Sequence, residues 1–65
     1  MIKVNGEPVS DADGMNVAEF LKTHGFPETM LAVECNGAII PRAKWQETCL
    51  EDGAVVEVVR FVGGG

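Results

Sequence analysis

The sequence predicts an α+β fold in which a mixed sheet of four or five strands packs on one helix. Three observations lead to this prediction. The pairs Asn5-Gly6 and Asn36-Gly37 each separate two short apolar segments, and Asn-Gly is a strong signal for a two-residue β-hairpin. Residues 17–24 carry apolar side chains at helical spacing. Residues 54–62 are rich in valine, which favours strands.

The size of the chain limits what it can do alone. With 65 residues it forms one domain and buries only about 60% of its unfolded surface, so it can build one small core. A walled pocket of the usual enzymatic volume, roughly 300–1,000 Å³, would take up much of that core. We therefore do not expect a self-contained enzyme.

Charge and hydropathy exclude two further classes. The formal net charge is -5, from ten acidic and five basic residues, and nucleic-acid binding needs clusters of Lys and Arg instead. An acidic surface suits solubility or a basic partner. The apolar stretches are far shorter than the ~20 residues of a membrane span, and the amino terminus does not resemble a signal peptide. We expect a cytoplasmic protein that binds neither nucleic acid nor membrane.

The first segment predicts a hairpin. Residues 1–4 and 7–10 form its two strands around Asn5-Gly6. Pro8 has no backbone N–H to donate, so its strand should lie at an edge of the sheet.

The helix has signals at both ends. Asn16 is a good N-cap, and Glu19 follows three residues later in the capping-box arrangement. Gly25 stands where a glycine ends a helix, which predicts a helix over residues 17–24. We expect His24, at its end, to pack or cap rather than to act in catalysis.

The middle of the chain predicts two more strands and an irregular crossing. Residues 30–36 and 38–40 flank the second Asn-Gly pair. Residues 42–48 are too short for a regular helix, and we expect a helical turn that lays Trp45 over the edge of the core. An isolated tryptophan without a basic groove is usually a core residue, although a stacking role is the alternative. Leu50 is also expected to be buried.

The valine-rich strand should pair parallel with the first strand and so lie at the centre of the sheet. Side chains alternate between the two faces of a strand, and Glu57 is unsuited to a small core. The inward set is therefore Val56, Val58, Arg60 and Val62. Val59 and Phe61 then point outward as a partner-binding patch. The alternative is that neighbouring side chains cover Phe61.

Three glycines, Gly63, Gly64 and Gly65, follow this strand without a polar spacer. Ordering glycine costs more entropy than ordering any other residue, so we expect a flexible tail at 63–65 after a folded domain at 1–62. The tail, with its terminal carboxylate, is interpreted as the working part. The alternative is an incidental glycine-rich terminus.

The cysteines do not indicate a metal centre or a disulfide framework. Cys35 and Cys49 lack CxxC spacing, and His24 is the one histidine of the chain. Both cysteines stand beside apolar or strand-like residues, so we expect buried, reduced thiols.

The whole chain resembles the ThiS-like sulfur carriers of thiamine biosynthesis, in the ubiquitin-like β-grasp family. The resemblance rests on the short length, the predicted order of elements, the terminal Gly64-Gly65 and two internal segments. One segment is Asn36 to Arg42, followed by Trp45, and the other is the Asp52-Gly53 turn. Gly63 is a departure from the Gly-Gly ending and leaves Gly65 as the reactive residue.

The resemblance implies a function for the tail. A ThiF-like adenylating enzyme would use ATP and Mg²⁺ to convert the Gly65 carboxylate into an acyl-adenylate. Sulfur from a donor such as a cysteine desulfurase would then give a thiocarboxylate, which a ThiG-like thiazole synthase would consume. The carrier itself would bind no cofactor and catalyse nothing.

Three other functions use the same tail or none. The first is a carrier for molybdopterin or another sulfur product. The second is a ubiquitin-like modifier joined to lysines through Gly65, and the third is an interaction module whose glycines are incidental.

Overall fold

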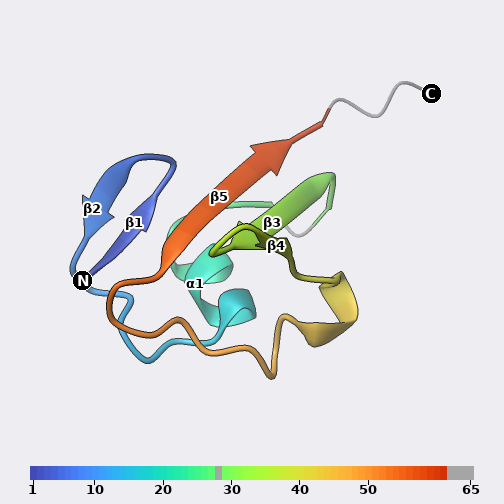
Figure 1. Cartoon of the computed structure of the whole chain (residues 1–65). Helices are drawn as coiled ribbons and strands as arrows, with labels where there is room; N and C mark the ends of the chain where they lie inside the picture. The colour runs from blue at the N-terminus through green and yellow to red at the C-terminus, as the bar shows by residue number, and fades with distance from the viewer. Residues whose placement is uncertain (28, 62–65) are drawn as a thin grey trace.

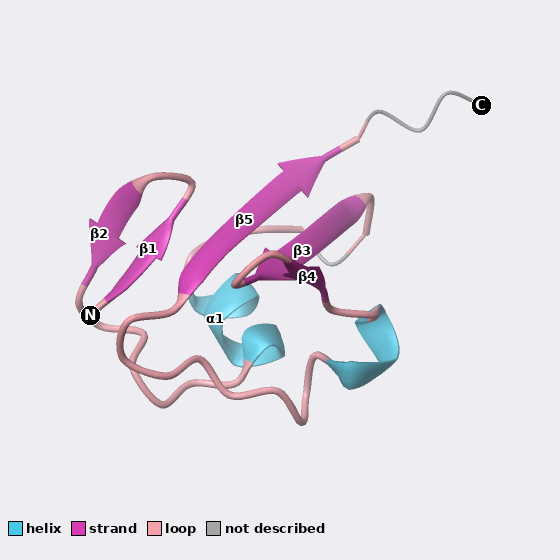
Figure 2. Cartoon of the chain, viewed as in Figure 1, coloured by secondary structure: helices cyan, strands magenta, loops and turns pink. Residues whose placement is uncertain are grey.

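The computed structural model describes residues 1–27 and 29–61. Figures 1 and 2 show a sheet with the α-helix beneath it. The elements are, in chain order, β1 (Ile2–Val4), β2 (Glu7–Val9), α1 (Val17–Thr23), β3 (Leu31–Cys35), β4 (Ala38–Ile39), a 3₁₀ turn (Arg42–Lys44) and β5 (Val55–Arg60).

The five strands form a mixed sheet in the order β2-β1-β5-β3-β4. β5 lies at the centre, parallel to β1 and antiparallel to β3, while β2 and β4 form the edges (Figure 1). The predicted α+β class, the central position of the last strand and the ubiquitin-like β-grasp fold are confirmed. The edge position of Pro8, on β2, is confirmed as well.

Both predicted hairpin turns are present. Asn5 and Gly6 have φ of 51° and 85°, and Asn36 and Gly37 have φ of 52° and 86°. A turn of type I′ needs positive φ at both central residues, which Asn and Gly tolerate best. β3 is shorter than the predicted strand at 30–36, because Met30 has a φ of 62° and Asn36 already belongs to the turn.

The helix begins as predicted and ends one residue earlier. The Glu19 amide donates to Oδ1 of Asn16 at 2.8 Å, which satisfies one of the free N–H groups of the first turn. His24 is the C-cap residue, and Gly25 follows with a φ of 78°. The His24 ring packs against Phe20, with 4.6 Å between ring centroids, so the expected packing of this histidine is confirmed.

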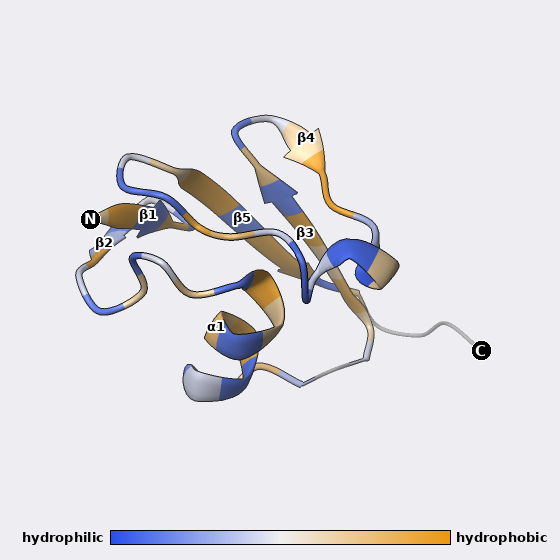
Figure 3. Cartoon of the chain, turned by 90° about the horizontal axis from the view of Figure 1, so that it is seen from below, coloured by the Kyte–Doolittle hydropathy of each residue, from blue (hydrophilic) through white to orange (hydrophobic). Residues whose placement is uncertain are grey.

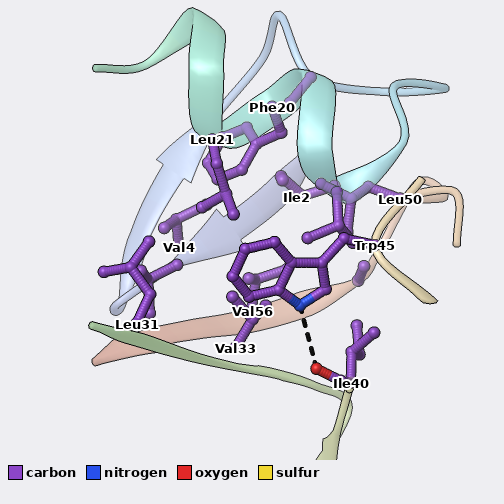
Figure 4. Close-up of a cluster of buried hydrophobic side chains, with 14 residues drawn as sticks. Ile2, Val4, Phe20, Leu21, Leu31, Val33, Ile40, Trp45, Leu50 and Val56 are labelled. Carbon is purple, nitrogen blue, oxygen red and sulfur yellow. Dashed lines mark hydrogen bonds between the residues drawn. The ribbon is translucent and has the colours of Figure 1, made fainter. Parts of the chain in front are cut away.

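One hydrophobic core lies between the helix and the sheet (Figure 4). Phe20, Leu50 and Val56 are among its fully buried side chains. Burying a side chain of this size stabilises a fold by roughly 1.5–3 kcal/mol. Trp45 lies over the edge of this core, and its indole Nε1 donates to the carbonyl of Ile40 at 3.0 Å. The predicted burial of Trp45 and Leu50 is thus confirmed.

Among residues 1–27 and 29–61, no helix has the length and apolar character needed to cross a membrane. The helix that the structure describes covers seven residues.

Candidate functional site

The candidate site is built on β5, whose two faces have opposite surroundings. Val56 and Val58 face the helix and are 1% and 7% exposed. Val59 and Phe61, on the other face, are 51% and 52% exposed. Both orientations agree with the alternation expected from the sequence. In Figure 3, β3 and β5 are largely orange ribbons interrupted by blue segments.

Arg60 shows where the inward set ends. Alternation assigns it to the helix side, but it is exposed and lies opposite Leu31, at the end of the β3–β5 ladder. Val62, the last member of the predicted inward set, lies outside the described residues.

The Asn5 side chain hydrogen-bonds to β5 beyond the point where β1 ends. Its Nδ2 donates to the Val58 carbonyl at 3.2 Å, and its Oδ1 accepts from the Val58 amide at 2.8 Å. The side chain thereby replaces one rung of the β1–β5 ladder, whose last register pair is Val4 with Val56. The C-terminal end of β5 projects past the β1–β2 hairpin (Figure 1).

We call the sheet surface opposite the helix the outer face. It contains the exposed side chains of β5 and the residues in register with them on the neighbouring strands. Val59 lies opposite Ala32 on β3, and the Phe61 amide donates to the Met30 carbonyl at 3.0 Å. The main members of the outer face are Lys3, Pro8, Ala32, Glu34, Ile39, Val55, Glu57, Val59 and Phe61.

This face exposes apolar side chains both on the edge strand β4 and at the end of β5. Ile39 is 69% exposed, and Phe61 is 52% exposed. The alternative that neighbouring side chains cover Phe61 is therefore wrong. Scattered exposed apolar residues are ordinary, but apolar residues gathered on one face indicate a surface for a partner.

Two acidic side chains interrupt the apolar surface. Glu34 lies directly opposite Glu57 in the β3–β5 ladder, and Ile39 lies opposite Glu34 on β4. Neither Glu34 nor Ile39 was predicted from the sequence to belong to the site. The pairing of Glu34 with Ile39 could have been predicted from the Asn36-Gly37 turn, because a two-residue hairpin fixes the register of its strands.

The predicted reactive residue, Gly65, is not among the described residues. Gly63, Gly64 and Gly65, and with them the predicted flexible tail, lie outside the described residues. The structure does describe the end of β5 and the outer face, which come directly before these residues in the chain.

The cysteines differ from each other, and the prediction for Cys49 was wrong. Cys35 is partly buried against the core, but Cys49 is exposed. The reason is alternation: Leu50 occupies the inward position in this extended segment, so its neighbour Cys49 points outward. Burial raises the pKa of the Cys35 thiol. Both cysteines line a small hollow of about 170 Å³ beside Gly53. In residues 1–27 and 29–61, no cluster of three or more metal-ligating side chains occurs.

A larger hollow, of about 510 Å³, lies on the helix side of the sheet. It is lined by Ala18, Leu21, Arg42, Ala43, Trp45 and Gln46. It is an open hollow on the surface and not the walled pocket that a self-contained enzyme would need. Its lining has no carboxylate, thiol, hydroxyl or imidazole to serve as nucleophile or general base. The Arg42 guanidinium lies 5.9 Å from the centroid of the Trp45 ring.

Comparison with known proteins identifies the family. The model of the ThiS family matches residues 1–65. The chain belongs to the ThiS family. The sulfur carrier protein ThiS of Bacillus subtilis is 33% identical over 66 residues, which covers 100% of both chains. A crystal structure of the thiamine biosynthesis protein ThiS from Geobacter metallireducens matches with a TM-score of 0.81 and 34% identity, covering 98% of this chain and 97% of that one.

Some ThiS-like segments belong to larger proteins. A thiazole synthase of Magnetococcus marinus is 36% identical over 64 residues, which are 98% of this chain and 20% of that protein. The chain thus spans about a fifth of the length of this curated relative and of a second thiazole synthase, of which it covers 19%.

Proposed function

We propose that this ThiS-family chain is a sulfur carrier for thiamine biosynthesis, in which Gly65 carries the sulfur as a C-terminal thiocarboxylate. The chain is then a co-substrate and not a catalyst. The observation that carries the proposal is the exposed apolar outer face at the end of the central strand, immediately before the glycines. Membership in the ThiS family supports it.

The chemistry requires activation by another protein. A carboxylate is a poor electrophile at neutral pH, so a ThiF-like enzyme would use ATP and Mg²⁺ to form the Gly65 acyl-adenylate and release pyrophosphate. The terminal sulfur of a persulfide, supplied by a donor such as a cysteine desulfurase, would attack the carbonyl carbon and displace AMP. A thiol would then cleave the sulfur–sulfur bond and leave the thiocarboxylate. The need for ATP supports a cytoplasmic location.

The glycines and the outer face have different roles in binding a partner. Glycine has no Cβ, so Gly63, Gly64 and Gly65 can enter a channel too narrow for other residues. Ordering three residues costs roughly 3–6 kcal/mol, at 1–2 kcal/mol each. Burial of the half-exposed Val59 and Phe61 would return about 1 kcal/mol each, half the value for a fully buried side chain. The rest of the face must supply the remainder, which is why a whole sheet surface is needed.

A thiazole synthase is the proposed acceptor. Two relatives named thiazole synthase contain a segment similar to this chain within a longer polypeptide. A carrier segment in the same polypeptide as the enzyme that consumes its sulfur would raise their effective concentration. This supports a ThiG-like partner for the separate chain.

The test is adenylation in vitro. The chain is incubated with ATP, Mg²⁺ and a ThiF-like enzyme, and exchange of labelled pyrophosphate into ATP is measured. We expect exchange with the full chain and none after deletion of Gly63, Gly64 and Gly65, which removes the whole glycine ending. Charging by the activating enzyme of the molybdopterin pathway alone would move the carrier to that pathway, and conjugates with lysine would make it a modifier.

A further inference from the structure

Glu34 and Glu57 form an unusual pair at the centre of the outer face. They lie directly opposite each other on adjacent antiparallel strands, where Cβ atoms are about 4.5–5.5 Å apart. Like charges in this position destabilise a sheet. Selection for stability alone would not favour two glutamates here.

The described residues provide no compensating ion pair. Within residues 1–27 and 29–61, the carboxylates that contact a basic group are Asp13 and Asp52 (with the Met1 amino group), Asp11 (with the His24 ring) and Glu47 (with Lys44). The nearest cation by register is Lys3, which lies opposite Val55 and makes no ion pair with either glutamate. The two carboxylates therefore depend on water.

Apolar side chains border the pair on both sides. Val59 and Ala32 form the neighbouring cross-strand pair toward the end of β5, and Ile39 lies beyond Glu34 on β4. A partner surface that contacts both Val59 and Ile39 must also cover Glu34. Docking would then remove water from the carboxylates, which is costly unless an opposite charge replaces it.

We propose that Glu34 and Glu57 recognise a basic side chain at the centre of the docking surface of the activating enzyme. This inference rests on the proposed carrier function. An arginine suits the position best, because its planar guanidinium can donate to two carboxylates at once. The occupant of the outer face is thus an apolar protein surface with an arginine or lysine within it. The net charge of -5 would attract such a surface at long range.

Removal of the two charges should raise or preserve stability but weaken binding. Glutamine keeps the size of glutamate and removes the repulsion, so the variant E34Q/E57Q should melt at the same or a higher temperature than the unchanged chain. It should also dock more weakly. A purely structural effect would change both quantities in the same direction.

The experiment measures adenylation of the full chain by a ThiF-like enzyme over a range of salt concentrations. For E34Q/E57Q we expect kcat/KM to fall at least tenfold at low salt, through KM, with a flatter salt dependence. E34K/E57K keeps a like-charge pair but reverses its sign, and it should lose more activity still. E51Q removes one charge from a turn outside the outer face and should stay within twofold.

The outcomes separate this inference from the proposed function. If the unchanged chain is adenylated and E34Q/E57Q matches it in KM and salt dependence, the inference is wrong and the carrier function stands. If the unchanged chain is not adenylated at all, both are wrong. A decrease in kcat/KM with an unchanged melting temperature supports both.

Discussion

The two faces of β5 use the same kinds of residues for different purposes. Val58 and Val59 are neighbours with identical side chains, yet they are 7% and 51% exposed. The inner valine helps to close the core beneath the sheet, and the outer valine leaves its apolar surface to solvent. Valine on this strand therefore stabilises the core on one face and is available to a partner on the other.

The largest effect should come from a charge on the inner face. In Val58→Asp a carboxylate enters the core without a partner, at a cost of several kcal/mol. A domain of this size has roughly 3–10 kcal/mol of stability, at 0.05–0.15 kcal/mol per residue. We expect the variant to be largely unfolded, measured by circular dichroism and chemical denaturation. A cooperative transition like that of the unchanged chain would contradict the assigned faces.

The same change one residue later should affect docking alone. Val59→Asp places the charge in solvent, so the free energy of unfolding should change by less than about 1 kcal/mol. Adenylation by a ThiF-like enzyme should lose at least tenfold in kcat/KM, because the charge lies in the apolar part of the docking surface.

Val55→Asp is the matched control for this loss. Val55 is 47% exposed on the same face but lies at the opposite end of β5. Its effect on adenylation should be smaller than that of Val59→Asp. Equal losses from the two variants would show that distance from the glycines does not matter.

An intermediate effect is expected at the edge of the core. Trp45→Phe keeps an aromatic ring but removes the donor to the Ile40 carbonyl. A buried acceptor left without its partner costs about 1–3 kcal/mol, and denaturation should show a loss of this size. Adenylation of the folded fraction should not change, because Trp45 lies on the helix side. A loss of charging without a loss of stability would instead point to the hollow beside Trp45.

Much of this comparison could be predicted from the sequence, because local chemistry decides it. The Asn5-Gly6 and Asn36-Gly37 turns, the Asn16 cap and the position of Glu57 each follow from one or two residues. The fold then follows from a few pairing rules.

Other features depend on contacts that the local sequence does not contain. Met30 was predicted to be in a strand but has a φ of 62°, which local propensity does not indicate for methionine. Cys49 was predicted to be buried, but the inward position belongs to Leu50. The opposition of Glu34 and Glu57 needs the register between β3 and β5, which are joined by a long connection that fixes no register by itself.

The smallest effect is a difference in thiol reactivity. Because burial raises the pKa of Cys35, a smaller fraction of this thiol is thiolate at neutral pH, and access to it is limited. We expect iodoacetamide to modify the exposed Cys49 faster at pH 7, and the rate at Cys35 to rise as the pH approaches its raised pKa. Peptide mass spectrometry measures both rates, and faster modification of Cys35 at pH 7 would contradict its burial.

The central claim is that the outer face presents Gly65 for conversion to a thiocarboxylate. The most direct test is intact and C-terminal-peptide mass spectrometry after incubation with ATP, Mg²⁺, a ThiF-like enzyme and a cysteine desulfurase with its substrate. The account predicts a gain of about 16 Da, one oxygen replaced by sulfur, located on the C-terminal peptide. Sulfur found on Cys49 instead, or an unchanged C-terminal peptide, would contradict it.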